Sequence, residues 1–205
     1  MAECGVPSRL IVTARRLAAV DQRRLWIPWR FKVFYGDMLM PLLGVLVQKD
    51  HAMKYDVVVE TAPAELVAAV RATVPISDIA RTWKPALDQV WALLKTNGEL
   101  DPGYNLFLYH HPERRNDAMN IDFGVQVKHQ FEGDGDVRCV ETPVGEVAKT
   151  VHIGPYDRLG DAHNAIHVWC VAHNRKIGRA SWEIYGDWNS DPALLETTIK
   201  YLLVG

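Results

Sequence analysis

The residues best suited to chemistry lie in one short segment, Trp182-Glu183-Ile184-Tyr185, whose aromatic and β-branched composition is typical of a strand. Neighbouring side chains of a strand point to opposite faces, so Glu183 and Tyr185 share one face and the two apolar residues share the other. If the apolar pair packs in the core, a carboxylate and a phenol project together from a rigid strand. The pattern predicts the floor of a pocket that binds an aromatic or cationic molecule.

A second informative segment, His152-Ile153-Gly154-Pro155-Tyr156, is typical of a strand that ends where a helix begins. Tyr156 follows the Gly-Pro pair at the helix start, where its ring could lie over the pocket. For His152 we expect a hydrogen-bonded structural role, and the alternative is a general acid or base.

The composition is that of an ordinary globular protein, with 205 residues, 48% hydrophobic residues, 23% charged residues and a net charge of −2. This charge gives no indication of direct nucleic-acid or membrane binding. The three cysteines are widely spaced, which argues against a disulfide framework and favours a reducing cytoplasmic location. The longest apolar run, residues 38–47, is too short to span a bilayer.

The composition changes near Met53, and we place a boundary there, between an N-terminal basic extension at 1–52 and a folded domain at 53–205. Arginines recur in the extension among aromatic residues, with few acids. We expect a disordered extension or an over-extended start, because the segment after Met53 resembles a natural beginning. The alternatives are a basic arm that touches nucleic acid or an acidic partner, and an organelle-import segment.

From Tyr55 onward, strand-like and helix-like segments follow one another in the same order twice. The first unit is expected to have strands at 55–60, 65–72, 104–110 and 120–127 and a helix at 76–97. The second is expected to have strands at 137–142, 146–152, 181–186 and 197–203 and a helix at 156–174. This order predicts an α+β fold, a pseudo-symmetric tandem of two β-α-β-β units with helices backing antiparallel sheets. In this alignment Tyr109 corresponds to Tyr185, and Phe107 corresponds to Glu183.

The residues that carry a family resemblance are His152-x-Gly154-Pro155-Tyr156 with Leu159-Gly160 after it, Trp169, and residues 182–185. With these the second half resembles the GyrI-like small-molecule-binding domain, the effector module of AraC- and MerR-type regulators. The first half resembles the same unit in degenerate form. The resemblance implies a ligand cleft between the two units and a pocket glutamate at Glu183. It also implies lipophilic, often cationic ligands, and one branch of the family hydrolyses cyclopropane-bearing natural products.

We expect one central cleft with Glu183 as its electrostatic anchor. Its ligand-binding residues are predicted to be Glu183, Tyr185, Tyr109, Tyr156, Phe107, Trp83, Trp169 and Asp122. Trp83 and Trp169 lie on the two helices and could seal the cleft, although core packing is the default expectation for Trp169. Asp122 would supply a second acid.

A possible metal-binding pattern occurs at His163, His167 and Cys170, which recur at helical spacing. We interpret this set as a solvated polar face, because it is rotated away from the apolar stripe expected on the same helix, which consists of Leu159, Ala162, Ile166 and Trp169. No metal and no cofactor is expected, since phosphate-binding and dinucleotide-binding motifs are lacking in the sequence.

These observations favour a protein that binds, senses or sequesters a lipophilic or cationic aromatic small molecule. The main alternative is a hydrolase of strained electrophiles, in which Glu183 acts as general acid or base and Tyr185 stabilises developing negative charge. A module that inhibits a protein partner through its surface is the third hypothesis, and the identity of such a partner is left open.

Overall fold

The computed structural model describes residues 55–112 and 118–205, so the extension predicted at 1–52 lies outside the described residues. Within these ranges two strands, a helix and two strands follow one another, and the same order then recurs. The strands are β1 (Val58–Ala62), β2 (Leu66–Val74), β3 (Asn105–His110), β4 (Met119–Gln126), β5 (Val137–Glu141), β6 (Gly145–Ile153), β7 (Lys176–Tyr185) and β8 (Glu196–Val204). The helices are α1 (Ile79–Thr96) and α2 (Leu159–Ala172), with short 3-10 turns η2 (Ile76–Asp78), η3 (Gly98–Leu100), η4 (Tyr156–Arg158) and η5 (Pro192–Leu194).

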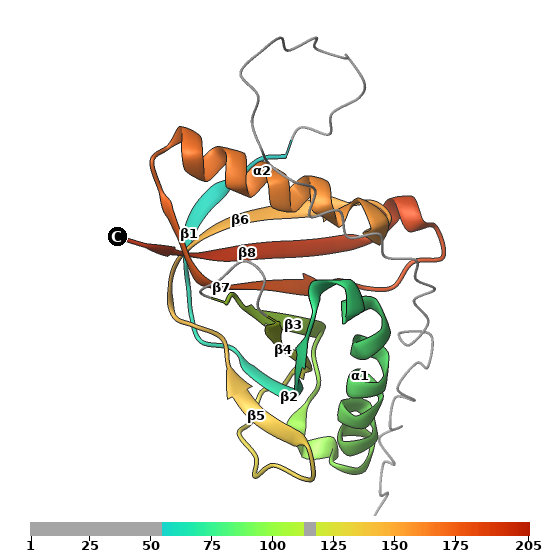
Figure 1. The fold of residues 1–205 in the computed structure, drawn as a ribbon. Coiled ribbons are helices and arrows are strands. Elements are labelled where there is room, and N and C mark those ends of the chain that lie inside the picture. The colour runs from blue at the N-terminus through green and yellow to red at the C-terminus, as the bar shows by residue number, and fades with distance from the viewer. Residues whose placement is uncertain (1–54, 113–117) are drawn as a thin grey trace, which may run out of the picture.

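The strands form one antiparallel sheet in the order β1-β6-β8-β7-β3-β4-β2-β5 (Figure 1). The predicted α+β fold is therefore confirmed. If β1 is exchanged with β5, β2 with β6, β3 with β7 and β4 with β8, the result is the same strand order read in reverse. Any closer symmetry between the two units stays a prediction. At the centre β3 pairs with β7, which sets Phe107 opposite Glu183.

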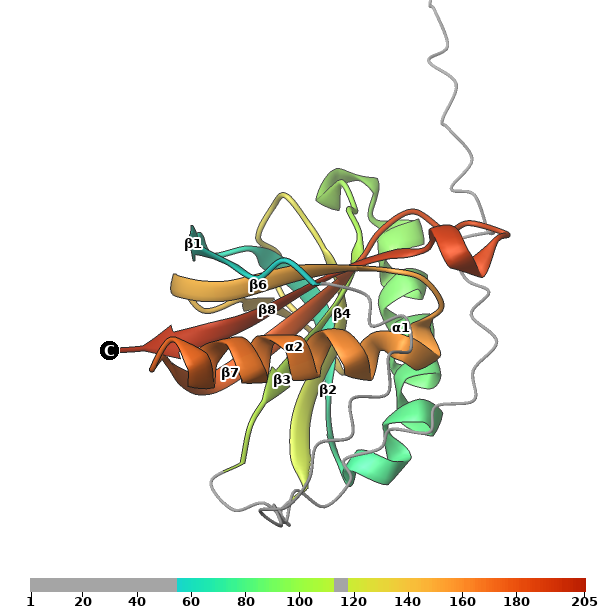
Figure 2. The ribbon, with the colours of Figure 1, turned by 90° about the horizontal axis from the view of Figure 1, so that it is seen from above.

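Both helices pack against the same face of this sheet (Figures 1 and 2). Phe107 pairs with Phe123 on one side and with Glu183 on the other, and Glu183 pairs with Ile199 on β8. Paired residues share a face, so these four side chains point to one side. Three of them, Phe107, Phe123 and Ile199, belong to the core cluster that contains the buried residues of α1 and α2. Helix α1 covers β2 and β4, and α2 covers β6, β7 and β8.

The opposite face carries a second, helix-free cluster. Its buried members are Ala62, Val67, Ala69, Leu106, Leu108, Val147, Ala180 and Trp182. They come from the central strands β3 and β7, from β1 and β6 at one end of the sheet, and from β2 near the other end. Since strands from both ends share one cluster, the sheet curls over this face. Trp182 is completely buried there, as the predicted alternation requires.

The buried stripe of α2 differs from the predicted one. The sequence suggests a stripe that ends at Trp169, whereas the structure buries Leu159, Ala162, Ile166 and Cys170. Trp169 is only half-buried and stacks on His173, with ring centroids 4.2 Å apart. Turning the helix in this direction brings its 163 position toward the sheet.

In the described part of the chain, no helix is long and apolar enough to cross a membrane.

The pairing of β4 with β2, in which Gly124 lies opposite Ala69, gives a test of the packing. A Cβ added at Gly124 would lie 2.5 Å from the carbonyl oxygen of Ala68 and 2.6 Å from Val67 Cγ1. Gly124→Ala should therefore lower the free energy of unfolding by about 1–3 kcal/mol, measured by urea denaturation.

Gly160→Ala is the matched control, because nothing lies within 4 Å of its added Cβ and the residue is in α2. It should leave stability unchanged or raise it by up to about 1 kcal/mol. Equal effects of the two substitutions would show that the β2–β4 contact is wrong.

Candidate functional site

Glu183 lies at the centre of the sheet and is 5% exposed. Its carboxylate accepts hydrogen bonds from three side chains on three elements. Tyr109 on β3 donates to Oε2 at 2.8 Å, and Tyr185 donates to the same oxygen. His163 on α2 reaches Oε1 through Nε2, also at 2.8 Å. Each carboxylate oxygen is therefore satisfied inside the protein, which a buried charge requires.

The surroundings keep this carboxylate charged. Burial raises the pKa of Glu183. The hydrogen bond and charge of His163, together with the two phenol hydrogen bonds, lower this pKa by more than burial raises it. The net pKa therefore lies below the usual value of 4.5. Burial and the Glu183 charge together raise the pKa of Tyr185 well above 10. At neutral pH the site is thus a buried anion held by protonated phenols.

His163 links this carboxylate to a second aromatic cluster. A carboxylate can only accept, so Nε2 of His163 donates to Glu183, and Nδ1 lies 3.0 Å from the Tyr201 hydroxyl. The rings of His111, His163 and His167 surround Tyr201, with centroids 5.1–5.7 Å away. Burial, followed by the charges of neighbouring histidines, lowers the pKa of His111 to about 4.

The prediction of a solvated polar face at His163, His167 and Cys170 is therefore wrong for two of its members. Cys170 is buried, and His163 points to Glu183 because α2 is rotated relative to the predicted stripe. The spacing Leu159, His163, Ile166 and Cys170 places His163 beside the buried stripe, and this signal was available in the sequence. Among the described residues, no three His, Cys, Asp or Glu side chains are grouped so as to hold a metal ion.

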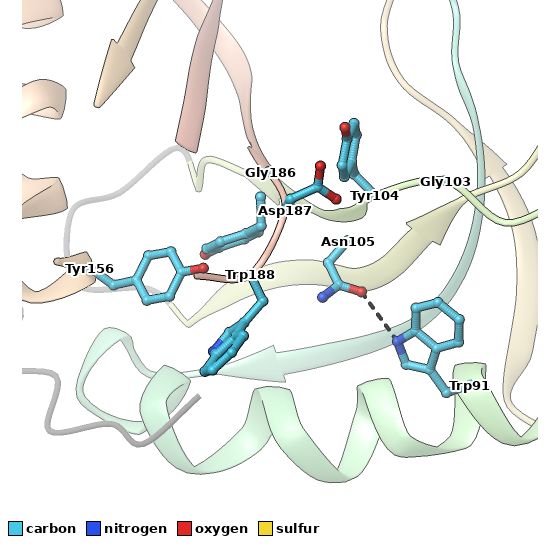
Figure 3. A pocket seen from close by; sticks show the side chains of 9 residues that line it. Trp91, Gly103, Tyr104, Asn105, Tyr156, Gly186, Asp187 and Trp188 are labelled. Atoms are coloured by element: carbon cyan, nitrogen blue, oxygen red, sulfur yellow. Dashed lines mark hydrogen bonds between the residues drawn. The ribbon is translucent and has the colours of Figure 1, made fainter. Parts of the chain in front are cut away.

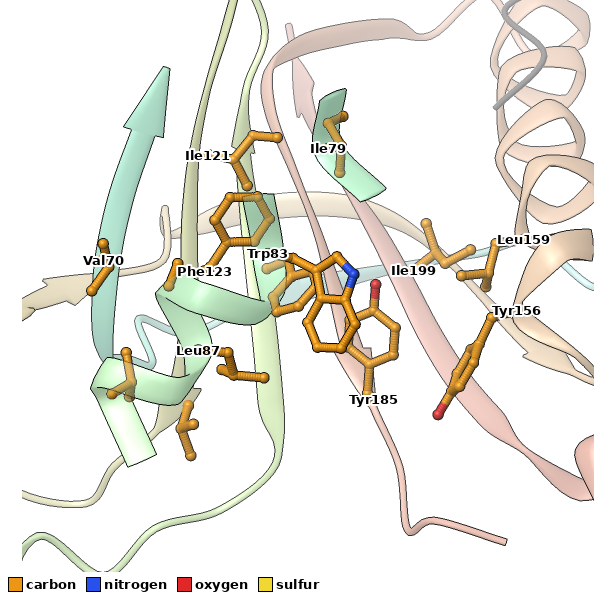
Figure 4. Packing of buried hydrophobic residues seen from close by; sticks show 14 of the residues in the cluster. Val70, Ile79, Trp83, Leu87, Ile121, Phe123, Tyr156, Leu159, Tyr185 and Ile199 are labelled. Carbon is orange, nitrogen blue, oxygen red and sulfur yellow. The ribbon is translucent and has the colours of Figure 1, made fainter. Parts of the chain in front are cut away.

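Aromatic rings fill the space between the two helices above the carboxylate. The ring centroid of Tyr185 lies 4.9 Å from that of Phe107 and 5.5 Å from that of Tyr156. Trp83 extends from α1, and its ring centroid lies 6.3 Å from that of Phe107. Figure 4 shows Trp83 and Tyr156 on either side of Tyr185. The structure thus gathers these four predicted residues into one aromatic group, and of the predicted tyrosines Tyr109 and Tyr185 bond to Glu183 directly.

A pocket opens beside this aromatic group, at the end of β7 (Figure 3). It is shallow: the empty space at its mouth amounts to about 370 Å³ only when the open solvent in front of it is included. It is lined by Trp91, Gly103, Tyr104, Asn105, Tyr156, Tyr185, Gly186, Asp187 and Trp188. Glu183 does not line it, so the ring of Tyr185 lies between the pocket and the carboxylate. Burial raises the pKa of Tyr156 to about 12, so its hydroxyl also stays protonated.

Two predicted residues lie elsewhere. Asp122 pairs with Leu108, one residue from Phe107, and so points to the opposite face of the sheet from Glu183. There Arg71 binds both of its oxygens at 2.7 Å, and His110 contacts it at 2.7 Å. A second acid for the cleft at Asp122 is therefore ruled out by strand alternation. Trp169 is directed away, toward His173.

The other predicted residue of the turn, His152, has the structural role expected for it. It is completely buried, and its ring nitrogens lie 2.8 Å from the Tyr55 hydroxyl and 3.1 Å from the carbonyl oxygen of Pro155. Burial is the main cause that lowers its pKa.

The sequence interpretation missed seven of the nine lining residues, among them Trp91, Asn105 and Trp188. Asn105 alternates with Phe107 and Tyr109 on one strand, so period two places it on the same face. Trp91 lies about two helical turns after Trp83 on α1. No comparable pattern identifies Trp188, which follows the end of β7.

Comparison with known proteins gives one family. The model of the GyrI-like small molecule binding domain matches residues 53–201. No curated protein sequence matches this chain.

Solved structures share the fold. The C-terminal domain of EcmrR has a TM-score of 0.63 at 24% identity, covering 74% of this chain and 99% of that one. SAV2435 bound to tetraphenylphosphonium has a TM-score of 0.55 at 15% identity, covering 75% and 95%. An uncharacterized conserved protein from Listeria innocua has a TM-score of 0.52 at 14% identity, covering 72% and 92%. At these identities the likeness is one of fold alone.

The contact between His163 and Glu183 can be tested with a double-mutant cycle in urea denaturation. Glu183→Gln and His163→Leu should each destabilise the protein, and the double variant should lose about 1–3 kcal/mol less than the sum of the two. The control cycle uses Glu146 and Arg175, an exposed pair at 2.7 Å, whose coupling should stay below about 1 kcal/mol. Additive losses at His163 and Glu183 would contradict the contact.

Proposed function

This chain belongs to the GyrI-like small-molecule-binding domain family, and we propose that it binds lipophilic aromatic cations in the cleft above Glu183. One observation carries the proposal: an ionised carboxylate is buried beneath aromatic rings, and one of these rings, that of Tyr185, lines a pocket that opens to solvent. Sensing or sequestration of such compounds is the resulting role.

The charge of Glu183 favours a cation over a neutral or anionic ligand. A buried carboxylate attracts a positive charge more strongly than an exposed one, because less water screens the interaction. The faces of Trp83, Tyr156 and Tyr185 each add about 0.5–2 kcal/mol through cation–π contact. An anion of the same shape would meet the same rings and a repulsive charge.

Access to Glu183 requires movement of the rings. Tyr185 both lines the pocket and donates to Glu183, so the arrangement described here is the closed form of the cleft. A ligand that enters from the pocket would displace Tyr156 or Trp83 and lie against the Tyr185 ring. Ring displacement of this kind lets one cleft accept ligands of different shape.

A hydrolase is the second candidate, because a direct hydrogen bond joins the carboxylate to a protonated phenol at the pocket wall. Such a pair could pass a proton to or from a strained electrophile and its attacking water. Incubation of the protein with cyclopropane-bearing electrophiles distinguishes the two: turnover that Glu183→Gln abolishes favours the enzyme, and stoichiometric binding without product favours the binder.

The binding proposal is tested with tetraphenylphosphonium and tetraphenylborate, two ions of nearly the same shape and opposite charge. Isothermal titration should give at least about tenfold tighter binding of the cation, and Glu183→Gln should weaken cation binding about tenfold or more. Glu132→Gln, in an exposed loop, is the control and should have no effect. Equal affinity for the two ions, or cation binding that survives Glu183→Gln, would overturn the proposal.

A further inference from the structure

Asn105 lies next to Tyr185 in the wall of the pocket. It is the first residue of β3 and pairs directly with Tyr185, so the two side chains leave the sheet next to each other on the same face. Both line the pocket. A group held by Asn105 would therefore lie beside the ring that covers Glu183.

Trp91 fixes the orientation of the Asn105 amide. The indole nitrogen of Trp91 donates to Asn105 Oδ1 at 3.2 Å. An indole N–H can only donate, so the oxygen of the amide must face Trp91 and its nitrogen must face the other way. Figure 3 shows this nitrogen turned away from Trp91, toward the side of the pocket where Tyr156 and Trp188 lie.

The amide nitrogen is a hydrogen-bond donor with no partner in the part of the chain that the structure describes. The sole bond recorded for the Asn105 side chain is the one from Trp91. The nitrogen is not among the buried atoms that lack a bond, so it is open to solvent. A donor oriented in advance and hydrated can be satisfied by a ligand acceptor with little loss of freedom.

The surrounding walls favour a flat or aromatic ligand. Tyr104 and Trp188 are 41% and 39% exposed although their rings are large and apolar. Such exposed rings beside a pocket are typical of a binding surface. Asp187 adds a carboxylate to the same wall.

We propose that Asn105, held by Trp91, makes this cleft prefer aromatic cations that carry a hydrogen-bond acceptor at their edge, such as a ring nitrogen, a carbonyl or an ether oxygen. This inference rests on the proposed function, since it concerns the outer part of the same ligand. The cation lies against Tyr185 and Glu183, and the acceptor receives a hydrogen bond from Asn105 Nδ2.

The test compares tetraphenylphosphonium, which has no acceptor, with the triphenyl(pyridyl)phosphonium ions, in which one ring carbon is replaced by nitrogen. In the wild-type protein at least one pyridyl regioisomer should bind about 2- to 10-fold tighter than tetraphenylphosphonium, the gain typical of one hydrogen bond. The ratio of the two affinities, rather than either affinity, is the readout.

Asn105→Leu removes the donor and should bring this ratio to one or below. Asn105→Asp keeps the size and the contact with Trp91 but presents an acceptor, and it should also abolish the preference. Trp91→Phe frees the amide to turn and should reduce the ratio. Asn120→Leu, an exposed asparagine on β4, is the control and should keep the wild-type ratio.

A wild-type ratio of one for all regioisomers, or a preference that survives in both Asn105 variants, would overturn this inference. These outcomes leave the proposed function standing as long as tetraphenylphosphonium binds and its binding depends on Glu183. Failure of the wild-type protein to bind any of these ions would overturn both.

Discussion

A carboxylate charge is buried at the junction of the two halves of the sheet, and much of the architecture serves to hold it there. The donors to Glu183 come from β3, β7 and α2, so the charge joins elements from both halves of the chain. A slip of one residue between β3 and β7 would turn Tyr109 to the other face and leave the carboxylate short of a donor. A rotation of α2 would remove His163. The register and the helix orientation are thus tied to a single electrostatic requirement.

The same requirement explains why the aromatic side chains gather where they do. Rings exclude water from Glu183 without offering hydrogen bonds that would compete with its donors. The Tyr185 ring contacts Phe107 in a tilted arrangement and Tyr156 edge to face, which are favourable geometries for aromatic pairs. A closed aromatic cover over an ionised group is stable without ligand, because the donors satisfy the charge. On our account it is also ready to accept a cation, because the negative charge is retained.

Local periodicity was enough to predict much of this site. Strand alternation placed Glu183, Tyr185, Phe107 and Tyr109 on one face, and the helix and strand segments fall close to their expected ranges. One failure comes from helix rotation, which depends on tertiary packing and is not specified by the local pattern. The α2 stripe therefore misdirected the interpretation of its histidines. Asp122 failed for a different reason, because its face follows from the register of β4 against β3, which the sequence does not specify.

The central claim is that Glu183 is an anion at neutral pH although it is buried. It is tested most directly by NMR of protein labelled with carbon-13 at glutamate carboxyl groups, with the Glu183 signal assigned by its loss in Glu183→Gln. We predict that this signal keeps the chemical shift of an ionised carboxylate from neutral pH down to below pH 4.5, because its donors hold the pKa under the usual value. A signal that titrates above pH 4.5, or that is already protonated at pH 7, would contradict the account.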